Sequence, residues 1–134
     1  DRIVYLDKDG RVIFGVYPGS VRIVASDAGK DYADNSWHHV VATLSPAAGD
    51  TLGQRLYIDG RLAAGSTTSV TAAQSFSGFW KVGCGNLDNW RHATSTSNEF
   101  DGPKYFTGQL QYVAVYNRAL SQAEVTEHFN AGVA

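Results

Sequence analysis

The sequence predicts an all-β sandwich or jelly roll that ends in one short helix. Stretches rich in Val, Ile, Tyr, Thr and Phe recur between closely spaced turn signals, a pattern typical of antiparallel strands joined locally. The hydrophobic period changes only near the C-terminus, in ALSQAEVTEHFNAG, residues 119–132. No internal repeat of propeller or solenoid length is present, so a single two-layer β domain is the expected architecture.

Length and composition define the broad class of the protein. A chain of 134 residues is predicted to form one domain, residues 1–134, and it can bury enough surface for a hydrophobic core. Its formal net charge is -2 and its basic residues are scattered, so nucleic acid is not an expected partner. No apolar run approaches the ~20 residues of a membrane span, and no membrane insertion is expected. Cys84 is the only cysteine and is expected to be a small buried residue.

Three turn signals organise the strands. Asp9-Gly10 separates IVYL from RVIFGVY, and Asp59-Gly60 separates RLYI from RLAAG. Each pair suits the two φ > 0 positions of a type I′ hairpin. Pro18-Gly19 separates RVIFGVY from SVRIVAS and suits a type II turn. The first 26 residues are therefore predicted to form a three-stranded meander.

The later strand candidates follow loops of different lengths. SWHHVVATLS, residues 36–45, has two largely apolar alternating sets and is predicted to be a central strand covered on both faces. Neighbouring strand residues point to opposite faces, so its two histidines cannot chelate one ion and are expected to be structural. FWKVGC, residues 79–84, is predicted as a short strand, and TGQLQYVAVYN, residues 107–117, as the longest strand.

The C-terminal helix has a well-defined start signal. Ser121 and Glu124 form the S-x-x-E capping box, and Leu120 and Val125 occupy the positions of a hydrophobic staple. Gly132 is predicted to end the helix as the C′ residue. The apolar residues of the helix fall on one face, so we expect the helix to lie on the sandwich.

The order of these segments resembles a known family. SWHHVVATL, RLYIDGRLAA, FWKVG and FTGQLQYVAVYNRALSQAEVTEHFNAG together are similar to the laminin G-like (LamG) jelly rolls of the concanavalin A-like lectin/glucanase superfamily, as found in bacterial secreted and surface proteins. The resemblance covers roughly residues 1–132, and VAVYNRALSQAEV is its most specific part. It implies a two-sheet antiparallel jelly-roll sandwich with one C-terminal helix, an extracellular location and a place in a larger cell-surface or secreted protein.

The chain departs from this family in two places. Members usually begin with two further strands, and neither precedes Asp1, so the domain is expected to be truncated at its N-terminus. The chain contains no Met, and we expect Asp1 to lie inside a longer precursor. Uncovered strand edges are a liability, so we expect a second copy of the chain or a separate peptide to cover them. Relatives often carry an acid near Gln111 that contributes to a calcium site, and a neutral amide disfavours calcium there.

The stretch NLDNWRHATSTSNEFDGPKYF, residues 86–106, is the candidate ligand-binding loop. Sugar recognition uses aromatic faces beside amide and carboxylate groups. The predicted ligand-binding residues of this stretch are Asn86, Asp88, Asn89, Trp90, Arg91, Asn98, Glu99, Asp101 and Tyr105. Alternatively, Trp90 is buried and pins a long loop to the sandwich. If Trp90 is buried and no aromatic ring lies open on a concave surface, the glycan hypothesis loses its main support.

A second loop carries the candidate metal ligands. Asp27, Asp31 and Asp34 in DAGKDYADN are candidate calcium ligands, which other loops would complete. Their spacing does not match an EF-hand loop, and the alternative is a solvated loop without metal. Calcium is therefore the only cofactor that the sequence suggests.

Catalysis is not expected. Glycoside hydrolysis uses two carboxylates that flank the scissile bond, and no predicted strand carries alternating acids that would point into a groove. We interpret the chain as a noncatalytic extracellular recognition module whose ligand is a glycan. The alternative is a structural or adhesive module that contacts a cell-surface protein and is completed by a strand from a partner or a second copy.

Overall fold

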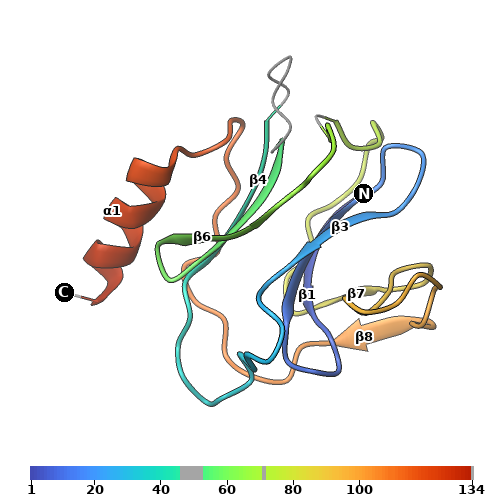
Figure 1. Ribbon diagram of the computed structural model, residues 1–134, viewed down its shortest axis with the longest axis horizontal. Coiled ribbons are helices and arrows are strands. Elements are labelled where there is room, and N and C mark those ends of the chain that lie inside the picture. Colours follow the sequence, from blue (N-terminus) through green and yellow to red (C-terminus); the bar gives the residue numbers. More distant parts are fainter. Residues whose placement is uncertain (46–52, 71, 134) are drawn as a thin grey trace.

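A computed structural model describes residues 1–45, 53–70 and 72–133 of the chain. Most of the predicted loop PAAGDTLGQ lies outside these ranges. The described residues contain eight strands and one helix, and the strands form antiparallel sheets (Figure 1). The predicted all-β sandwich with one C-terminal helix is thereby confirmed. None of the described helical residues belongs to a helix that is long and apolar enough to cross a membrane.

The first sheet is the predicted N-terminal meander. It is antiparallel, with the order β1-β2-β3, and its strands are β1 (Arg2–Leu6), β2 (Val12–Val16) and β3 (Arg22–Ala25). The turn between β1 and β2 is longer than the predicted type I′ turn, because Asp7 N donates to Arg11 O at 3.0 Å and only Gly10 has a positive φ, 71°. The Asp7 carboxylate stabilises this wider turn by accepting hydrogen bonds from the backbone of Asp9 and Arg11, both at 3.0 Å.

The second sheet contains the predicted Asp59-Gly60 hairpin. Its order is β4-β5-β6, and its strands are β4 (Val40–Leu44), β5 (Gln54–Ile58) and β6 (Arg61–Gly65). Asp59 and Gly60 have φ values of 51° and 79°, so the predicted type I′ turn is confirmed. The strand predicted at residues 36–45 begins only at Val40, and it lies at an edge of this sheet and is mostly half-buried, so the prediction of a central strand covered on both faces is wrong.

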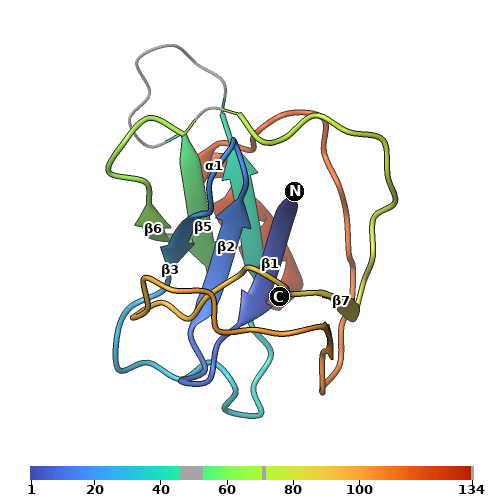
Figure 2. The same cartoon turned by 90° about the vertical axis from the view of Figure 1, so that its right-hand side faces the viewer.

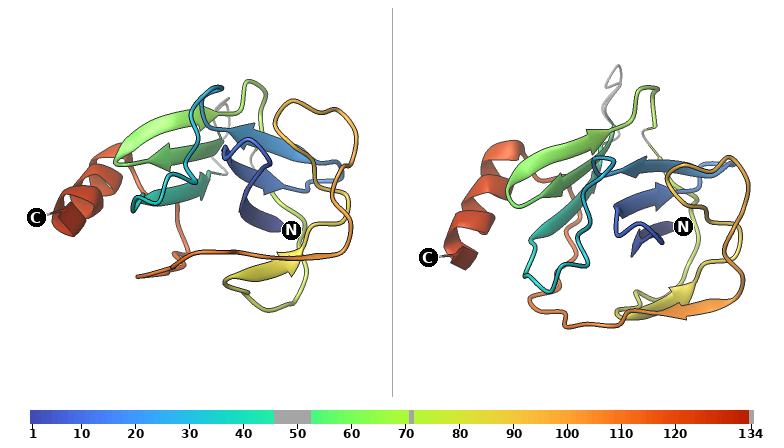
Figure 3. Two further views of the ribbon diagram at one scale, coloured as in Figure 1. Left: turned by 90° about the horizontal axis from the view of Figure 1, so that it is seen from below. Right: turned by 60° about the horizontal axis from the view of Figure 1, so that its bottom comes forward.

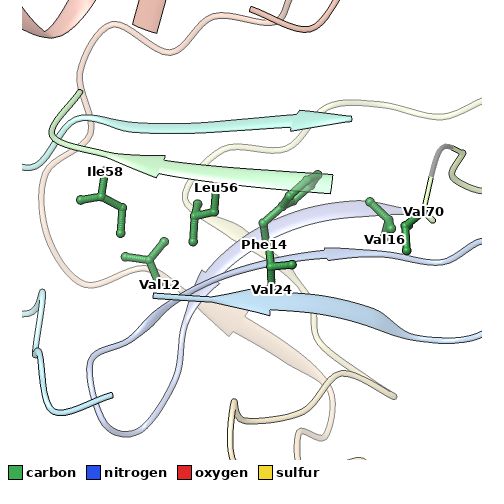
Figure 4. Packing of buried hydrophobic residues seen from close by; sticks show 7 residues of the cluster. All are labelled: Val12, Phe14, Val16, Val24, Leu56, Ile58 and Val70. Carbon is green, nitrogen blue, oxygen red and sulfur yellow. The ribbon is translucent and has the colours of Figure 1, made fainter. Parts of the chain in front are cut away.

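The hydrophobic core lies between these two sheets (Figure 4). Alternate residues of β2 point into it, and the side chains that form the core are Val12, Phe14, Val16, Val24, Leu56, Ile58 and Val70. Ile13 and Gly15 face the other side of β2 and are also buried. Because β2 is covered on both faces, something outside the two sheets must cover its second face.

The helix α1 (Gln122–Val133) covers the outer face of the second sheet, where Tyr57, Leu120 and Val125 form a second apolar cluster (Figure 3). The capping box is confirmed, because Ser121 Oγ accepts a hydrogen bond from Glu124 N at 3.3 Å and Glu124 Oε2 accepts one from Ser121 N at 2.8 Å. The helix continues through residue 132, so the prediction that Gly132 is the C′ residue is wrong.

The last two strands form a separate short pair, β7 (Cys84–Asn86) and β8 (Pro103–Tyr105). The prediction of a long paired strand at residues 107–117 is wrong, and of the strand predicted at residues 79–84 only Cys84 is paired. Both stretches run on from the β7-β8 pair without joining a sheet (Figure 2). Cys84 is exposed, because β7 lies at the margin of the molecule, so the expectation that it is buried is also wrong.

Candidate functional site

The loop between β7 and β8 covers the outer face of the first sheet, and Trp90 is its central contact. The indole of Trp90 is only 5% exposed and packs over Gly15 of β2. A Cβ atom at residue 15 would lie 2.2 Å from Cζ3 of Trp90, so the ring occupies the space that a side chain would otherwise fill. Burial therefore favours the structural interpretation of Trp90, whose ring face is not available for a sugar to stack on.

Polar contacts hold the same loop on the β1-β2 hairpin. Tyr5 Oη donates to Arg91 O at 2.7 Å, and the backbone N of residue 93 donates to Asp7 Oδ2 at 3.1 Å. Lys8 N donates to His92 Nδ1 at 3.2 Å. Burial raises the pKa of Tyr5 to about 12, so its hydroxyl stays protonated as a donor. These contacts attach the loop to the first sheet.

Beside this loop lies a hollow of about 580 Å³, here called the loop hollow. Five of the predicted ligand-binding residues line it, namely Asp88, Asn89, Trp90, Arg91 and Asn98. The rest of its lining comes from residues that the sequence did not single out, namely Asp1, Tyr17, Gly19, Ser20, Val21, Gln74 and Thr96. The hollow thus combines amide, carboxylate, guanidinium and phenol groups from four separate parts of the chain.

The polar side chains of the loop form hydrogen bonds within the loop. Asp88 Oδ2 accepts a hydrogen bond from Asn86 Nδ2 at 2.9 Å, and Asp88 Oδ1 accepts one from Gly102 N. These two contacts lower the pKa of Asp88, in that order of size, so its carboxylate is ionised at neutral pH. Asn98 Nδ2 donates to Asn89 Oδ1 at 3.2 Å, which orients both amides at the rim of the hollow.

Arg91 has donor capacity that the protein does not use. Its Nη1 donates to Thr96 O at 3.4 Å, and its Nε is buried with no hydrogen-bond partner. Because Nε is buried, only the terminal nitrogens of the Arg91 guanidinium group can supply donors to a ligand in the loop hollow.

The remaining predicted ligand-binding residues lie outside the loop hollow. Asn86 donates a hydrogen bond to Asp88, and Glu99 Oε2 lies 3.8 Å from His92 Nε2. Asp101 is paired with Lys104 at 3.1 Å on the surface. Tyr105 is 77% exposed on β8. The predicted set therefore divides into a group around the hollow and four residues that are not part of it.

Sequence reasoning missed Tyr17, Ser20 and Gln74 as lining residues. Tyr17 and Ser20 flank the Pro18-Gly19 turn, and Tyr17 O accepts a hydrogen bond from Gln74 N at 2.9 Å. The Pro18-Gly19 turn was recognisable in the sequence. The aromatic Tyr17 beside it was the signal that could have identified this turn as part of a candidate site. Its approach to residue 74 is a long-range contact that the sequence pattern does not show.

The candidate calcium ligands are not brought together. The described residues contain no group of three His, Cys, Asp or Glu side chains that could hold a metal ion. Asp31 Oδ1 accepts a hydrogen bond from Ala33 N at 2.7 Å, and Asp34 Oδ1 accepts one from Ser36 N at 2.9 Å. Asp31 and Asp34 thus stabilise turns of this loop, and calcium binding by Asp27, Asp31 and Asp34 stays a prediction.

His38 lies between two carboxylates. Its Nδ1 is 2.9 Å from Asp59 Oδ2, and its Nε2 is 3.1 Å from Asp34 Oδ1. Burial lowers the pKa of His38, but the hydrogen bonds to Asp59 and Asp34 outweigh burial, and the pKa is raised above 6.5. His38 therefore joins the loop at residues 27–36 to the β5-β6 hairpin, which is the structural role predicted for it.

Comparisons with known proteins agree with this architecture. The model of a laminin G-like family, described as the Concanavalin A-like lectin/glucanases superfamily, matches residues 1–126. A crystal structure of an S-layer domain-containing protein (residues 221–444) from Clostridium thermocellum is similar, with 21% identity and a TM-score of 0.50. The match covers 96% of this chain and 55% of that one, so the chain spans about half of the solved structure. Among curated proteins, no significant match was found.

Proposed function

Because this chain belongs to the laminin G-like part of the concanavalin A-like lectin/glucanases superfamily, we propose that it is a noncatalytic recognition module that binds carbohydrate at the loop hollow. We further propose that it belongs to a bacterial cell-surface protein and acts outside the cell. The name of its structural neighbour, an S-layer domain-containing protein, supports that location.

The observation that carries this proposal is the convergence of polar side chains around one hollow. Asn89, Asn98 and Arg91 supply donors and acceptors for hydroxyl groups, and Asp88 supplies an ionised acceptor. Binding sites for small molecules are concave and place a few polar groups around an apolar surface. Since the ring of Trp90 is buried, the partly buried Tyr17 is the aromatic residue of the hollow that can contact a sugar ring.

The chemistry of Asp88 supports recognition over hydrolysis. A glycosidase needs one carboxyl group whose pKa is raised, so that it can protonate the leaving group. The pKa of Asp88 is lowered by its hydrogen bonds, and Glu124 is occupied by the capping box and by Arg118, whose Nη2 lies 2.6 Å from Glu124 Oε1. Both carboxylates are therefore suited to structural or ligand-holding roles.

A glycan array, run once with calcium and once with a chelator, tests this proposal. We expect the wild-type chain to bind a defined set of glycans. Asn98→Ala should weaken that binding at least tenfold, because it removes an amide from the rim of the loop hollow. Asp101→Asn is the matched control, since this exposed residue of the same loop lies outside the hollow. Absence of binding in both conditions, or equal loss in both variants, would contradict the carbohydrate proposal and favour a structural or adhesive module.

A further inference from the structure

The lining of the loop hollow carries more negative than positive charge. Among the described residues that line it, Asp1 and Asp88 have carboxylates and Arg91 has a guanidinium group. Asp88 is ionised at neutral pH, because hydrogen bonds from Asn86 and Gly102 lower the pKa of its carboxyl group. An acidic ligand that enters this concave surface therefore meets a net charge of its own sign.

Two arginines that are close in sequence do not reverse this charge. Arg2 and Arg22 are both paired across the sheet with Val16, whose side chain points into the core between the two sheets. Cross-strand partners point to the same face of a sheet, so both arginines start from that face. The indole of Trp90 packs over Gly15 on the opposite face, and neither arginine lines the loop hollow.

The cation on β8 is also committed elsewhere. Lys104 interacts electrostatically with Asp88, but its Nζ donates to Asp101 O at 2.6 Å and to Asp101 Oδ1 at 3.1 Å. The negative charge of Asp101 in turn acts on Asp88. Because the charges of Lys104 and Asp101 offset each other, the excess of negative charge at the hollow remains.

Arg91 is poorly placed to hold an anion. A carboxylate or a sulfate group is held best by two parallel N–H donors of one guanidinium group. Nε of Arg91 is buried, and its Nη1 donates to Thr96 O at 3.4 Å. The side-on pair of donors that includes Nε is therefore closed to a ligand.

The amides of Asn89 and Asn98 suit hydroxyl groups better than anions. Asn98 Nδ2 donates to Asn89 Oδ1, and within the described residues Asn98 Oδ1 and Asn89 Nδ2 make no hydrogen bond. Turning both amides over again leaves one oxygen and one NH₂ group free, so this result does not depend on their assignment. A sugar hydroxyl can donate to the oxygen and accept from the NH₂ group, whereas a carboxylate or a sulfate can only accept.

We propose that the loop hollow binds uncharged glycans and discriminates against glycans that carry uronate, sialate or sulfate groups. This inference rests on the proposed function, because it names the class of carbohydrate that the same site binds. Hydroxyl groups pair with the amides of Asn89 and Asn98, while Asp1 and Asp88 repel an acidic group. At a physiological ionic strength of ~0.15 M the Debye length is ~8 Å, so this repulsion acts on a ligand inside the hollow.

The glycan array tests this selectivity when it contains neutral, sialylated, uronate-containing and sulfated glycans together with matched pairs. Amylose, mannan and galactan are the neutral members of the pairs, and oxidation of their C6 hydroxyl groups to carboxylates gives the acidic members. We expect the bound glycans to be neutral and to bind about tenfold or more tightly than their acidic forms at ~0.01 M salt. This ratio should approach one at ~1 M salt, where the Debye length is only ~3 Å.

Asp1→Asn isolates the contribution of charge. Within the described residues the Asp1 side chain makes no hydrogen bond or ion pair, so the change removes a charge from the hollow without breaking a contact. The ratio of neutral to acidic binding should fall by about twofold to fivefold at low salt. Glu127→Gln is the matched control, because it removes the same charge from α1, which lies across the molecule from β7 and β8 (Figure 1).

The possible failures can be told apart. Acidic glycans that bind as tightly as their neutral forms at low salt would overturn the inference and leave carbohydrate binding intact. A ratio that salt does not change, or that Asp1→Asn and Glu127→Gln change equally, would also overturn it, because charge would not be the cause. Absence of binding to every glycan would contradict the proposed function and this inference with it. Circular dichroism of both variants shows that they are folded.

Discussion

Replacing Gly15 with Ala should displace the indole of Trp90 and destabilise the fold. The new methyl carbon would lie 2.2 Å from Cζ3, 2.8 Å from Cε3 and 3.0 Å from Cη2 of Trp90. Carbon atoms pack at about 3.5–4.0 Å, so the ring must move by more than about 1 Å. Overpacking of this kind costs about 1–3 kcal/mol of unfolding free energy.

The same contact can be isolated with a double-mutant cycle. Trp90→Ala alone should cost about 3–5 kcal/mol, because it removes a buried aromatic ring. In that background the methyl of Gly15→Ala has no ring to meet, so the second change should cost almost nothing. The coupling free energy between the two positions is therefore expected to be about 1–3 kcal/mol.

Urea unfolding followed by circular dichroism measures each free energy. Tryptophan fluorescence gives a second measurement, because Trp37 and Trp80 are 62% and 64% exposed while Trp90 is buried. Gly15→Ala should therefore shift the emission to longer wavelength and increase quenching by iodide. Gly85→Ala is the control, since a Cβ there meets nothing within 4 Å. Equal costs of Gly15→Ala with and without the indole would refute the packing argument.

Two further predictions concern the helix start and the histidine between two carboxylates. Ser121→Ala removes the acceptor for Glu124 N and should lower the unfolding free energy by about 1 kcal/mol. Urea unfolding measures this change, and an unchanged midpoint would contradict the role of the capping box. The folded-state pKa of His38 is raised above 6.5, because hydrogen bonds to Asp59 and Asp34 outweigh burial. The stability that His38 contributes is therefore complete below pH 6.5 and is lost as the pH rises through its folded pKa. Unfolding midpoints of wild type and His38→Gln should converge as the pH rises, and a constant difference would exclude this explanation.

Local sequence signals predicted those parts of the fold that local geometry controls. The Asp59-Gly60 turn needs two positive φ values, and the residue types that tolerate them are recognisable without a structure. The helix start is similarly local, because Ser121 and Glu124 satisfy each other's backbone donors. The Asp9-Gly10 turn was predicted at the right place with the wrong type, because the side chain of Asp7 stabilises a wider loop.

The strand prediction failed where pairing depends on a distant partner. Residues 107–117 have the composition of a central strand, but a strand exists only when a neighbour accepts and donates its backbone hydrogen bonds. Among the described residues no such neighbour is present, and the segment stays unpaired. The sequence of residues 107–117 shows a strand propensity. It does not show whether a neighbouring strand is present to pair with them.

By itself, the sequence determined the β-sandwich class, the hairpins and the capped helix, because each depends on residues that are close together in the chain. It also predicted that residues 86–106 supply polar groups for a ligand, which stays a prediction, and left open whether Trp90 points outward or inward. Only the tertiary structure decided that question, because the space for the indole is created by the absence of a side chain at Gly15, on another strand. The loop hollow depends on tertiary structure for the same reason, since Tyr17 and Gln74 reach it through contacts that are distant in sequence.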